Sequence, residues 1–95
     1  MAELPPIMTY RLSEHAKLEM ARRIISEDVV RETLASPEQA ERVRPGRAVY
    51  QSRFQFGDPR RTYLVRVFVD IDREPPDVVT LYRTSKVEKY WRGKL

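Results

Sequence analysis

The chain has 95 residues, which is enough for one domain with a single modest core, and it contains no cysteine. The absence of cysteine excludes disulfides, thiolate nucleophiles and cysteine-based zinc sites, and because no apolar stretch is long enough to span a bilayer we expect a cytoplasmic protein without membrane contact. Lys and Arg number 18 against 14 Asp and Glu, and the net charge of +4, with a pI near 9.7, favours phosphodiester chains as partners.

Two helices are predicted near the start of the chain, over about residues 13–36. Ser13 and Ser26 each stand where an N-cap is expected, with acidic residues in the turn that follows. In the first of these helices Ala16, Met20 and Ile24 recur at every fourth position. This spacing predicts a buried stripe along one side of the helix.

After the second helix, which ends at Ser36-Pro37, the pattern becomes that of a sheet over about residues 47–84. The connection that follows this proline is predicted either as a short helical turn or as irregular chain, and Pro45-Gly46 marks a turn. Strands are expected over residues 47–54, 62–71 and 78–84. In the strand over 62–71 alternate apolar residues face one side, while Arg66 lies among apolar neighbours on the other side.

The segment after the last strand, Ser85-Lys86-Val87-Glu88, matches a capping box and predicts a terminal helix over about residues 85–93. No repeat or linker divides the sequence, so residues 1–95 are expected to form one domain. Helices followed by consecutive strands predict the α+β class, in which N-terminal helices pack on a three- to four-stranded antiparallel sheet and a short C-terminal helix follows.

His15 is the only histidine, and it lies in the first turn of the first predicted helix, where the positive end of the helix dipole disfavours the imidazolium form. A neutral imidazole can act as a general base, for example towards a ribose 2′-hydroxyl. The alternative is a solvent-facing histidine with no chemical role. Arg22 shares one stripe of the helix with His15, whereas Arg23 is rotated towards the core side, where a basic residue either extends to solvent or reaches across to the sheet.

Hydroxyl groups and cations gather at the end of the last predicted strand. They are Tyr82, Arg83, Thr84, Ser85 and Lys86, with Lys89 following on the terminal helix. Such a cluster can bind a phosphate and stabilise charge that develops on it. The alternative gives each residue a structural role, as a helix cap, as part of the core or as a solvated charge.

We expect no metal and no cofactor. One histidine without cysteine or clustered carboxylates leaves no transition-metal site. Asp70-Ile71-Asp72 is disfavoured as a magnesium pair, because it borders a turn and magnesium needs converging oxygen ligands.

The opening segment, Ser13-Glu14-His15-Ala16 followed by Met20, Arg23 and Ile25-Ser26, resembles the pattern His-Ala-x-x-x-Met-x-x-Arg-x-Ile-Ser of the domain of unknown function 4258 family. The segment from Val78 to Trp91 resembles the frequent ending of that family, and the likeness extends over most of the chain from Tyr10 to Trp91. Two positions depart from the family pattern. Glu19 stands where Arg is frequent, and Ile24 stands where Gly is common, which implies a different bend between the helices.

This resemblance implies membership in the barnase–EndoU–colicin–RelE group, with N-terminal helices against a four-stranded antiparallel sheet. Many members of that group are metal-independent ribonucleases, often toxins neutralised by a partner protein. The resemblance therefore implies a ribonuclease toxin of a toxin–antitoxin system, with RNA, free or on the ribosome, and an acidic antitoxin protein as partners.

In that interpretation RNA is cleaved by attack of its 2′-hydroxyl, with His15 as the base. Arg23 or Arg66 holds the scissile phosphate, and Tyr82 or Lys86 assists the leaving oxygen. The expected substrate contacts are Arg22, Arg83, Thr84, Ser85 and Lys89. Two alternatives stay open: a non-catalytic RNA- or ribosome-binding module, and a protein-interaction domain.

Overall fold

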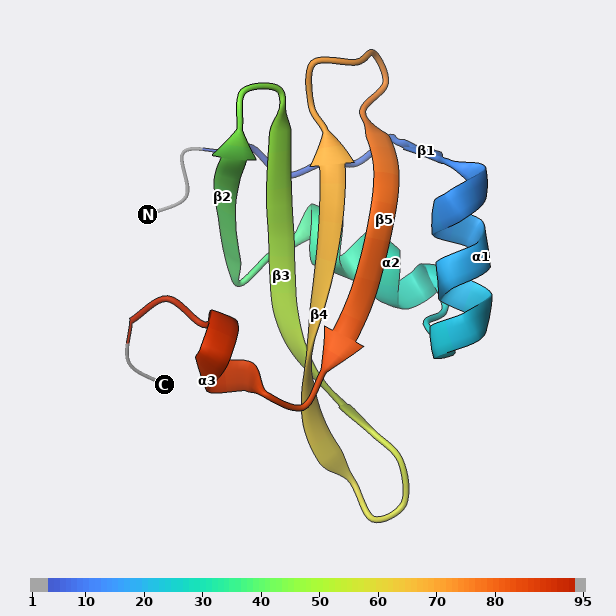
Figure 1. The fold of residues 1–95 in the computed structure, drawn as a ribbon, viewed down its shortest axis with the longest axis vertical. Coiled ribbons are helices and arrows are strands. Elements are labelled where there is room, and N and C mark those ends of the chain that lie inside the picture. The colour runs from blue at the N-terminus through green and yellow to red at the C-terminus, as the bar shows by residue number, and fades with distance from the viewer. Residues whose placement is uncertain (1–3, 94–95) are drawn as a thin grey trace.

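The structure, a computed structural model, describes residues 4–93 and confirms the α+β class (Figure 1). The elements in chain order are β1 (Arg11–Leu12), α1 (Glu14–Arg23), α2 (Glu27–Ala35), β2 (Gln39–Arg44), β3 (Arg47–Phe56), β4 (Arg61–Asp70), β5 (Asp77–Thr84) and α3 (Val87–Tyr90). None of the helices in this part of the chain is long and apolar enough to cross a membrane.

The sheet is larger than predicted and it is mixed. Its strand order is β1-β5-β4-β3-β2, with β1 parallel to β5 and all other neighbours antiparallel. The prediction of three or four strands beginning near residue 47 is therefore wrong in the number of strands and in where the sheet begins. The predicted antiparallel arrangement holds for β2 to β5 but not for β1. Backbone pairing explains the difference, because Glu38 donates its N–H to the carbonyl oxygen of Gln51 at 3.1 Å and so starts β2 directly after the second helix.

The core lies on the face of the sheet that α2 covers from behind in Figure 1. Val30 and Leu34 of α2 are fully buried there against alternate residues of the central strands. Those strand residues include Ala48, Tyr50, Val65, Val67, Val69 and Leu81. We call the opposite face, which carries the alternate residues of the same strands, the outer face of the sheet.

Helix α1 lies beside the β5 edge of the sheet (Figure 1). The predicted cap at Ser13 is confirmed, because its hydroxyl accepts the N–H of Ala16 at 3.0 Å. The same hydroxyl donates to the carbonyl oxygen of Val79 at 3.2 Å, so the cap also ties the start of α1 to β5. Ser26 caps α2 in the predicted way, accepting the N–H of Val29.

The buried stripe predicted on α1 ends before Ile24, whose residue surface is 76% exposed. Ile24 follows the last helical residue and takes a left-handed backbone conformation, with φ of 55°. Ile25 enters the core in its place, and its N–H bonds the carbonyl oxygen of Met20 at 2.9 Å. A left-handed residue commonly ends a helix, although a β-branched side chain is strained there.

The terminal helix is shorter than the predicted span of 85–93, because α3 comprises only Val87–Tyr90. Ser85 is not its cap. The residue in the N-cap position is Lys86, which makes no side-chain capping bond, and the N–H of Lys86 is bonded instead by the hydroxyl of Thr84 at 3.1 Å.

We expect Ile24→Gly to raise the free energy of unfolding by about 0.5 to 1 kcal/mol, since glycine removes the steric cost of positive φ and the lost side chain is mostly exposed. Urea unfolding followed by circular dichroism measures the change. Ile24→Ala is the matched control, because it shortens the side chain but keeps a Cβ at the strained position. A glycine variant no more stable than the alanine variant would contradict the strain argument.

Candidate functional site

A row of polar side chains crosses the outer face, with one residue from each of four adjacent strands. Gln39, Gln51, Arg66 and Tyr82 are successive register partners from β2 to β5. Gln51 donates an amide hydrogen to the side-chain oxygen of Gln39 at 2.7 Å. Arg66 donates from Nε to the side-chain oxygen of Gln51 and from Nη1 to the hydroxyl of Tyr82, both at 2.8 Å. The row therefore fixes the guanidinium group of Arg66 from two sides.

Aromatic rings surround the same guanidinium group. Its central carbon lies 4.5 Å from the ring centroid of Tyr90, 5.4 Å from that of Phe68 and 5.9 Å from that of Tyr82. No carboxylate within residues 4–93 forms an ion pair with Arg66. Its positive charge is thus held in place by neutral partners, which is the arrangement that suits an arriving anion.

Helix α1 adds a second arginine to this place. The guanidinium carbon of Arg23 lies 5.9 Å from the ring centroid of Tyr82. Of the two alternatives that the sequence leaves for Arg23, the structure therefore shows the reach across to the sheet. The carboxylate of Glu19, which is only 4% exposed, accepts hydrogen bonds from Arg23 at 2.6 Å and from Arg22 at 2.8 Å.

Glu19 connects these arginines to the only histidine of the chain. The hydrogen bond from Arg23 lowers the pKa of the Glu19 carboxyl, and the charges of Arg22, Arg23 and His15 act in the same direction against the effect of burial. His15 itself is exposed and lies one helical turn before Glu19. Its ring makes no hydrogen bond with residues 4–93, so no hydrogen bond there joins His15 to the row.

A separate depression lies between the end of α1 and the end of β5. It is lined by Arg22, Arg23, Ile24, Tyr63, Arg83, Thr84 and Ser85, and we call it the arginine pocket. Arg83 pairs with Val65 in the sheet register and so projects on the helix-covered side, opposite to Tyr82. Its guanidinium carbon lies 4.6 Å from the ring centroid of Phe56 and 5.0 Å from that of Tyr63.

The structure thus divides the residues that the sequence groups together. Arg66 and Tyr82 meet on the outer face, whereas the arginine pocket is lined by Arg22, Arg83, Thr84 and Ser85. Arg23 lies at both places. Lys86 and Lys89 stand exposed around α3, and the amine of Lys89 lies 5.5 Å from the ring centroid of Tyr90.

Sequence reasoning missed Gln39, Gln51, Glu19 and the two aromatic residues Phe68 and Tyr90 as parts of the site. Gln51 is 3% exposed, which is unusual for an amide side chain unless its polar atoms are bonded. In the sequence it is one polar residue of an alternating strand, and nothing there distinguishes it from a solvent-facing glutamine. The only signal for Glu19 is its acidic side chain, four residues from His15 and from Arg23.

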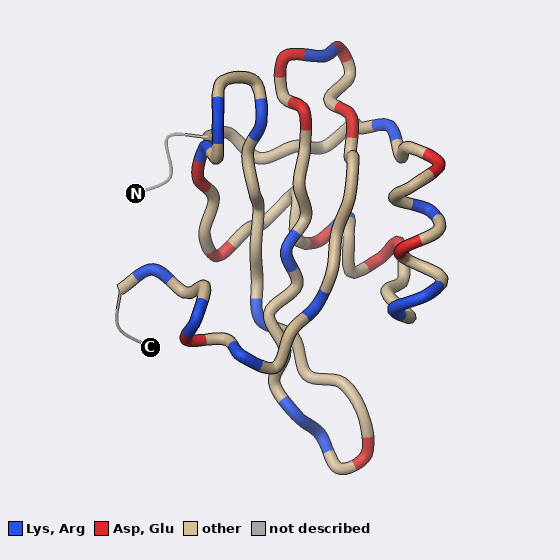
Figure 2. The backbone as a smooth tube through the Cα atoms, in the orientation of Figure 1, with Lys and Arg blue, Asp and Glu red and all other residues tan. Residues whose placement is uncertain are grey.

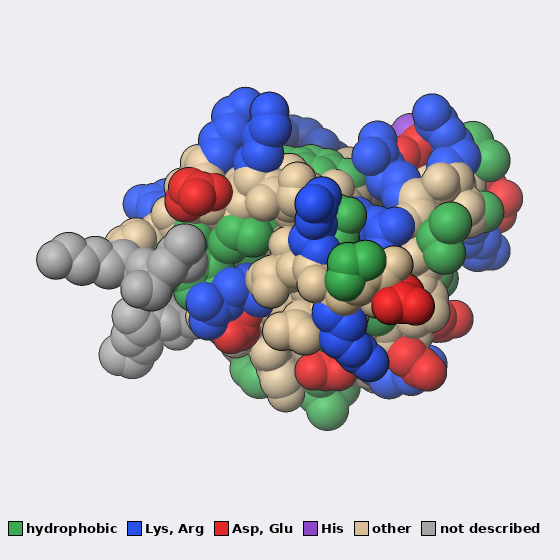
Figure 3. Space-filling model, turned by 90° about the horizontal axis from the view of Figure 1, so that it is seen from below, with side chains coloured by type: hydrophobic (Ala, Val, Ile, Leu, Met, Phe, Trp, Pro, Cys, Tyr) green, Lys and Arg blue, Asp and Glu red, His purple; other side chains and the backbone are tan. Residues whose placement is uncertain are grey.

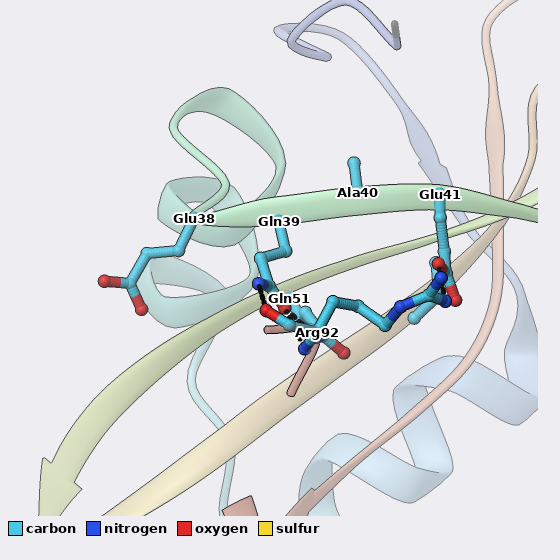
Figure 4. A pocket seen from close by; sticks show the side chains of 7 residues that line it. Glu38, Gln39, Ala40, Glu41, Gln51 and Arg92 are labelled. Carbon is cyan, nitrogen blue, oxygen red and sulfur yellow. Dashed lines mark hydrogen bonds and ion pairs between the residues drawn. The ribbon is translucent and has the colours of Figure 1, made fainter. Parts of the chain in front are cut away.

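A second hollow lies on the other half of the outer face, between β2 and the C-terminal segment (Figure 4). Gln39 donates to the carbonyl oxygen of Arg92 at 2.8 Å and accepts the N–H of the same residue, and the Arg92 side chain pairs with Glu41. Glu38, the other charged residue of this hollow, pairs with Arg53, so each charged side chain that lines it already has an ion-pair partner. No group of three or more His, Asp or Glu residues that could hold a metal ion lies within residues 4–93.

The lowered pKa of Glu19 leads to a pH-dependent stability. A carboxyl whose pKa is lower in the folded state stabilises the fold above its unfolded value of about 4.3, and this stabilisation is lost as the pH falls through the folded value. We expect Glu19→Gln to be less stable than the unaltered protein at pH 7, and we expect the difference to shrink as the pH falls below about 4.3 and to vanish once the pH is below the lowered folded pKa of Glu19. Urea unfolding at several pH values measures it. The control is Glu14→Gln, in an exposed pair on the same helix, and an equal pH response in both variants would count against the role of Glu19.

Comparison with known proteins identifies a family for this chain but does not identify a reaction. The model of the family described as Domain of unknown function (DUF4258) matches residues 12–83, which include α1, α2 and the sheet up to Arg83 but not α3. No curated protein and no solved structure matches the chain. Because the family match spans well over half of the sequence, the chain belongs to the domain of unknown function 4258 family.

Proposed function

We propose that the protein is a metal-independent endoribonuclease that holds the scissile phosphate on the outer face, beside Arg66 and Tyr82. The observation that carries the proposal is the fixed guanidinium group of Arg66, which has no ion-pair partner within residues 4–93 and lies next to a phenol hydroxyl. A phosphodiester transition state gains negative charge on its non-bridging oxygens, and donors already oriented towards that charge stabilise it most. Arg23, beside the same tyrosine, supplies a second cation.

The proposed reaction is attack of the ribose 2′-hydroxyl on the adjacent phosphorus. His15 takes the 2′-hydroxyl proton, the O2′–P bond forms, the P–O5′ bond breaks, and Tyr82 gives its proton to O5′. The products are a 2′,3′-cyclic phosphate and a 5′-hydroxyl. Because His15 and Tyr82 make the two proton transfers and Arg66 stabilises the charge on the phosphate, the proposed reaction does not call for a metal ion. The tyrosine oxygen accepts a hydrogen bond from Arg66, which leaves the phenol hydrogen for another acceptor and stabilises the phenolate after transfer.

Tyr82 and His15 lie at different distances from the proposed position of the phosphate. Tyr82 lies in the row itself, whereas His15 precedes Arg23 by eight helical residues, or about 12 Å along the axis. Glu19 lies between them and pairs with Arg23. The net charge of +4 supports the remaining part of the proposal, in which an acidic antitoxin protein covers this basic surface.

We expect the protein to cleave single-stranded RNA in the presence of EDTA, and Tyr82→Phe and His15→Ala each to lower the rate by about a hundredfold or more, because each removes one proton-transfer group. Tyr82→Phe keeps the ring that contacts Phe68 and Tyr90. Gel analysis of a labelled oligonucleotide measures the rate, and analysis of its ends identifies a cyclic phosphate. An oligonucleotide with one 2′-deoxy residue should resist cleavage after that residue.

Lys17→Ala, an exposed change on the same helix as His15, is the control and should cleave normally. Cleavage that requires a divalent metal, or that is unchanged in Tyr82→Phe, would contradict the proposed mechanism. A His15→Ala variant with normal activity would remove the histidine from it. Salt-sensitive RNA binding without any cleavage would favour the non-catalytic binding module instead.

A further inference from the structure

Both ends of the long axis carry basic residues, whereas acidic residues are concentrated at one of them (Figure 2). The β4–β5 connection at one end carries acidic residues, namely Asp70, Asp72, Glu74 and Asp77. The β3–β4 hairpin projects from the other end, where the basic residues include Arg60, Arg61 and Arg83. Figure 3 looks onto this hairpin end and shows Lys and Arg side chains spread across it, with apolar side chains and several acidic ones between them.

We infer that the arginine pocket and the adjoining aromatic side of the β3–β4 hairpin bind a phosphate and a base of a single-stranded polynucleotide, outside the place of cleavage. This inference shares with the proposed function only its substrate class, single-stranded RNA. It deepens that function by naming where the strand is held.

Arg83 is the central cation of this second site. Its guanidinium group lies over the rings of Phe56 and Tyr63, and no described residue forms an ion pair or a side-chain hydrogen bond with it. Half-buried arginines normally have polar partners, since their donors are costly to leave unbonded. The rings therefore orient a guanidinium group whose donors are free for the oxygens of a phosphate.

The opposite wall of the pocket adds two arginines from the end of α1. Arg22 and Arg23 are held there by the carboxylate of Glu19. One carboxylate against three arginines leaves the pocket with net positive charge. The pocket is open to solvent, so a phosphate of a continuing chain can enter without being enclosed.

Aromatic rings beside the pocket suit a base rather than a phosphate alone. Phe56 and Tyr63 pack edge-to-face with their centroids 5.7 Å apart, and Phe54 lies 6.2 Å from Phe56. All three are only partly buried, because the hairpin extends past the helices that cover the rest of this face (Figure 1). Partly exposed rings among arginines are the composition of single-strand binding surfaces, where bases stack and cations contact the backbone.

Ile24 provides an independent argument for a ligand at this place. It costs stability through its left-handed backbone, and it exposes 76% of its surface without packing in the core. Ile24 lines the arginine pocket. Backbone strain that brings no packing gain is characteristic of binding sites, and an apolar rim residue can contact the base or ribose of a bound strand.

The test measures binding of a fluorescent single-stranded 2′-O-methyl RNA oligonucleotide, which lacks the free 2′-hydroxyl needed for cleavage, by anisotropy over a range of salt concentrations. Arg83→Gln should weaken binding about fivefold or more and lower the slope of log Kd against log salt by about 0.7, the value of one phosphate contact on a single strand. Tyr63→Leu should weaken binding about fivefold or more and leave the salt slope unchanged, since it removes stacking and no charge.

Two further variants distinguish binding in the arginine pocket from a general effect of charge and from a loss of folding. Arg73→Gln removes the same charge from the acidic end and should leave affinity and slope nearly unchanged. Ile24→Gly, which is expected to be more stable, should bind less tightly, a result that loss of folding cannot produce. Equal losses for Arg83→Gln and Arg73→Gln, or a duplex of the same sequence that binds as tightly as the single strand, would overturn the inference.

The test of this second binding site can fail or succeed independently of the test of the ribonuclease. Lys17→Ala should bind the uncleavable oligonucleotide normally. Binding that depends on Arg83 in a protein that cleaves no RNA supports the second site and overturns the ribonuclease. Cleavage that depends on Tyr82, with binding insensitive to Arg83 and Tyr63, supports the ribonuclease and overturns the second site.

Discussion

The arrangement of the outer face depends on how strand pairing holds Arg66. The register places Gln51 on one side of it and Tyr82 on the other, so two of its donors meet acceptors at 2.8 Å. Both acceptors are neutral, so the guanidinium group loses conformational freedom while no carboxylate in the described part of the chain neutralises its charge. An anion that binds there meets a donor that is already ordered, which reduces the entropic cost of binding. A carboxylate in place of either partner would order the arginine equally well but would neutralise it.

Arg23 joins two places that the sheet keeps apart. Successive residues of a strand point to opposite faces, so Tyr82 and Arg83 are neighbours in the chain but lie on different sides of β5. Helix α1 stands at the β5 edge, and from there Arg23 contacts the ring of Tyr82 and also lines the arginine pocket. Because Glu19 fixes this arginine, α1 and the sheet edge form one continuous cationic rim. A polynucleotide that passes around this edge can contact the pocket and the outer face together.

At the end of α1, Ile24 lowers the stability of the fold and also lines the arginine pocket. The family resemblance expects glycine there, and the structure gives Ile24 the left-handed conformation that glycine adopts at low cost. The chain thus has a strained, exposed isoleucine beside three arginines, and an acidic residue, Glu19, one turn before it on α1. Glu19 is another departure from the family pattern, and its ion pairs with Arg22 and Arg23 shape the same rim.

The helices and the central strands could be predicted from the sequence alone, because they depend on local chemistry. Serine caps, the stripe of Ala16 and Met20, and the alternation from Tyr63 to Ile71 depend on residues close together in the chain, and so does the isolation of Arg66 on the far side of β4. The tertiary structure alone decided the two edge strands and the early end of the α1 stripe. It also decided the bonding of Gln51. Each of these depends on partners distant in sequence: β1 and β2 form because β5 and β3 present unpaired backbone groups to them, and Gln51 is buried because Arg66 and Gln39 satisfy its amide.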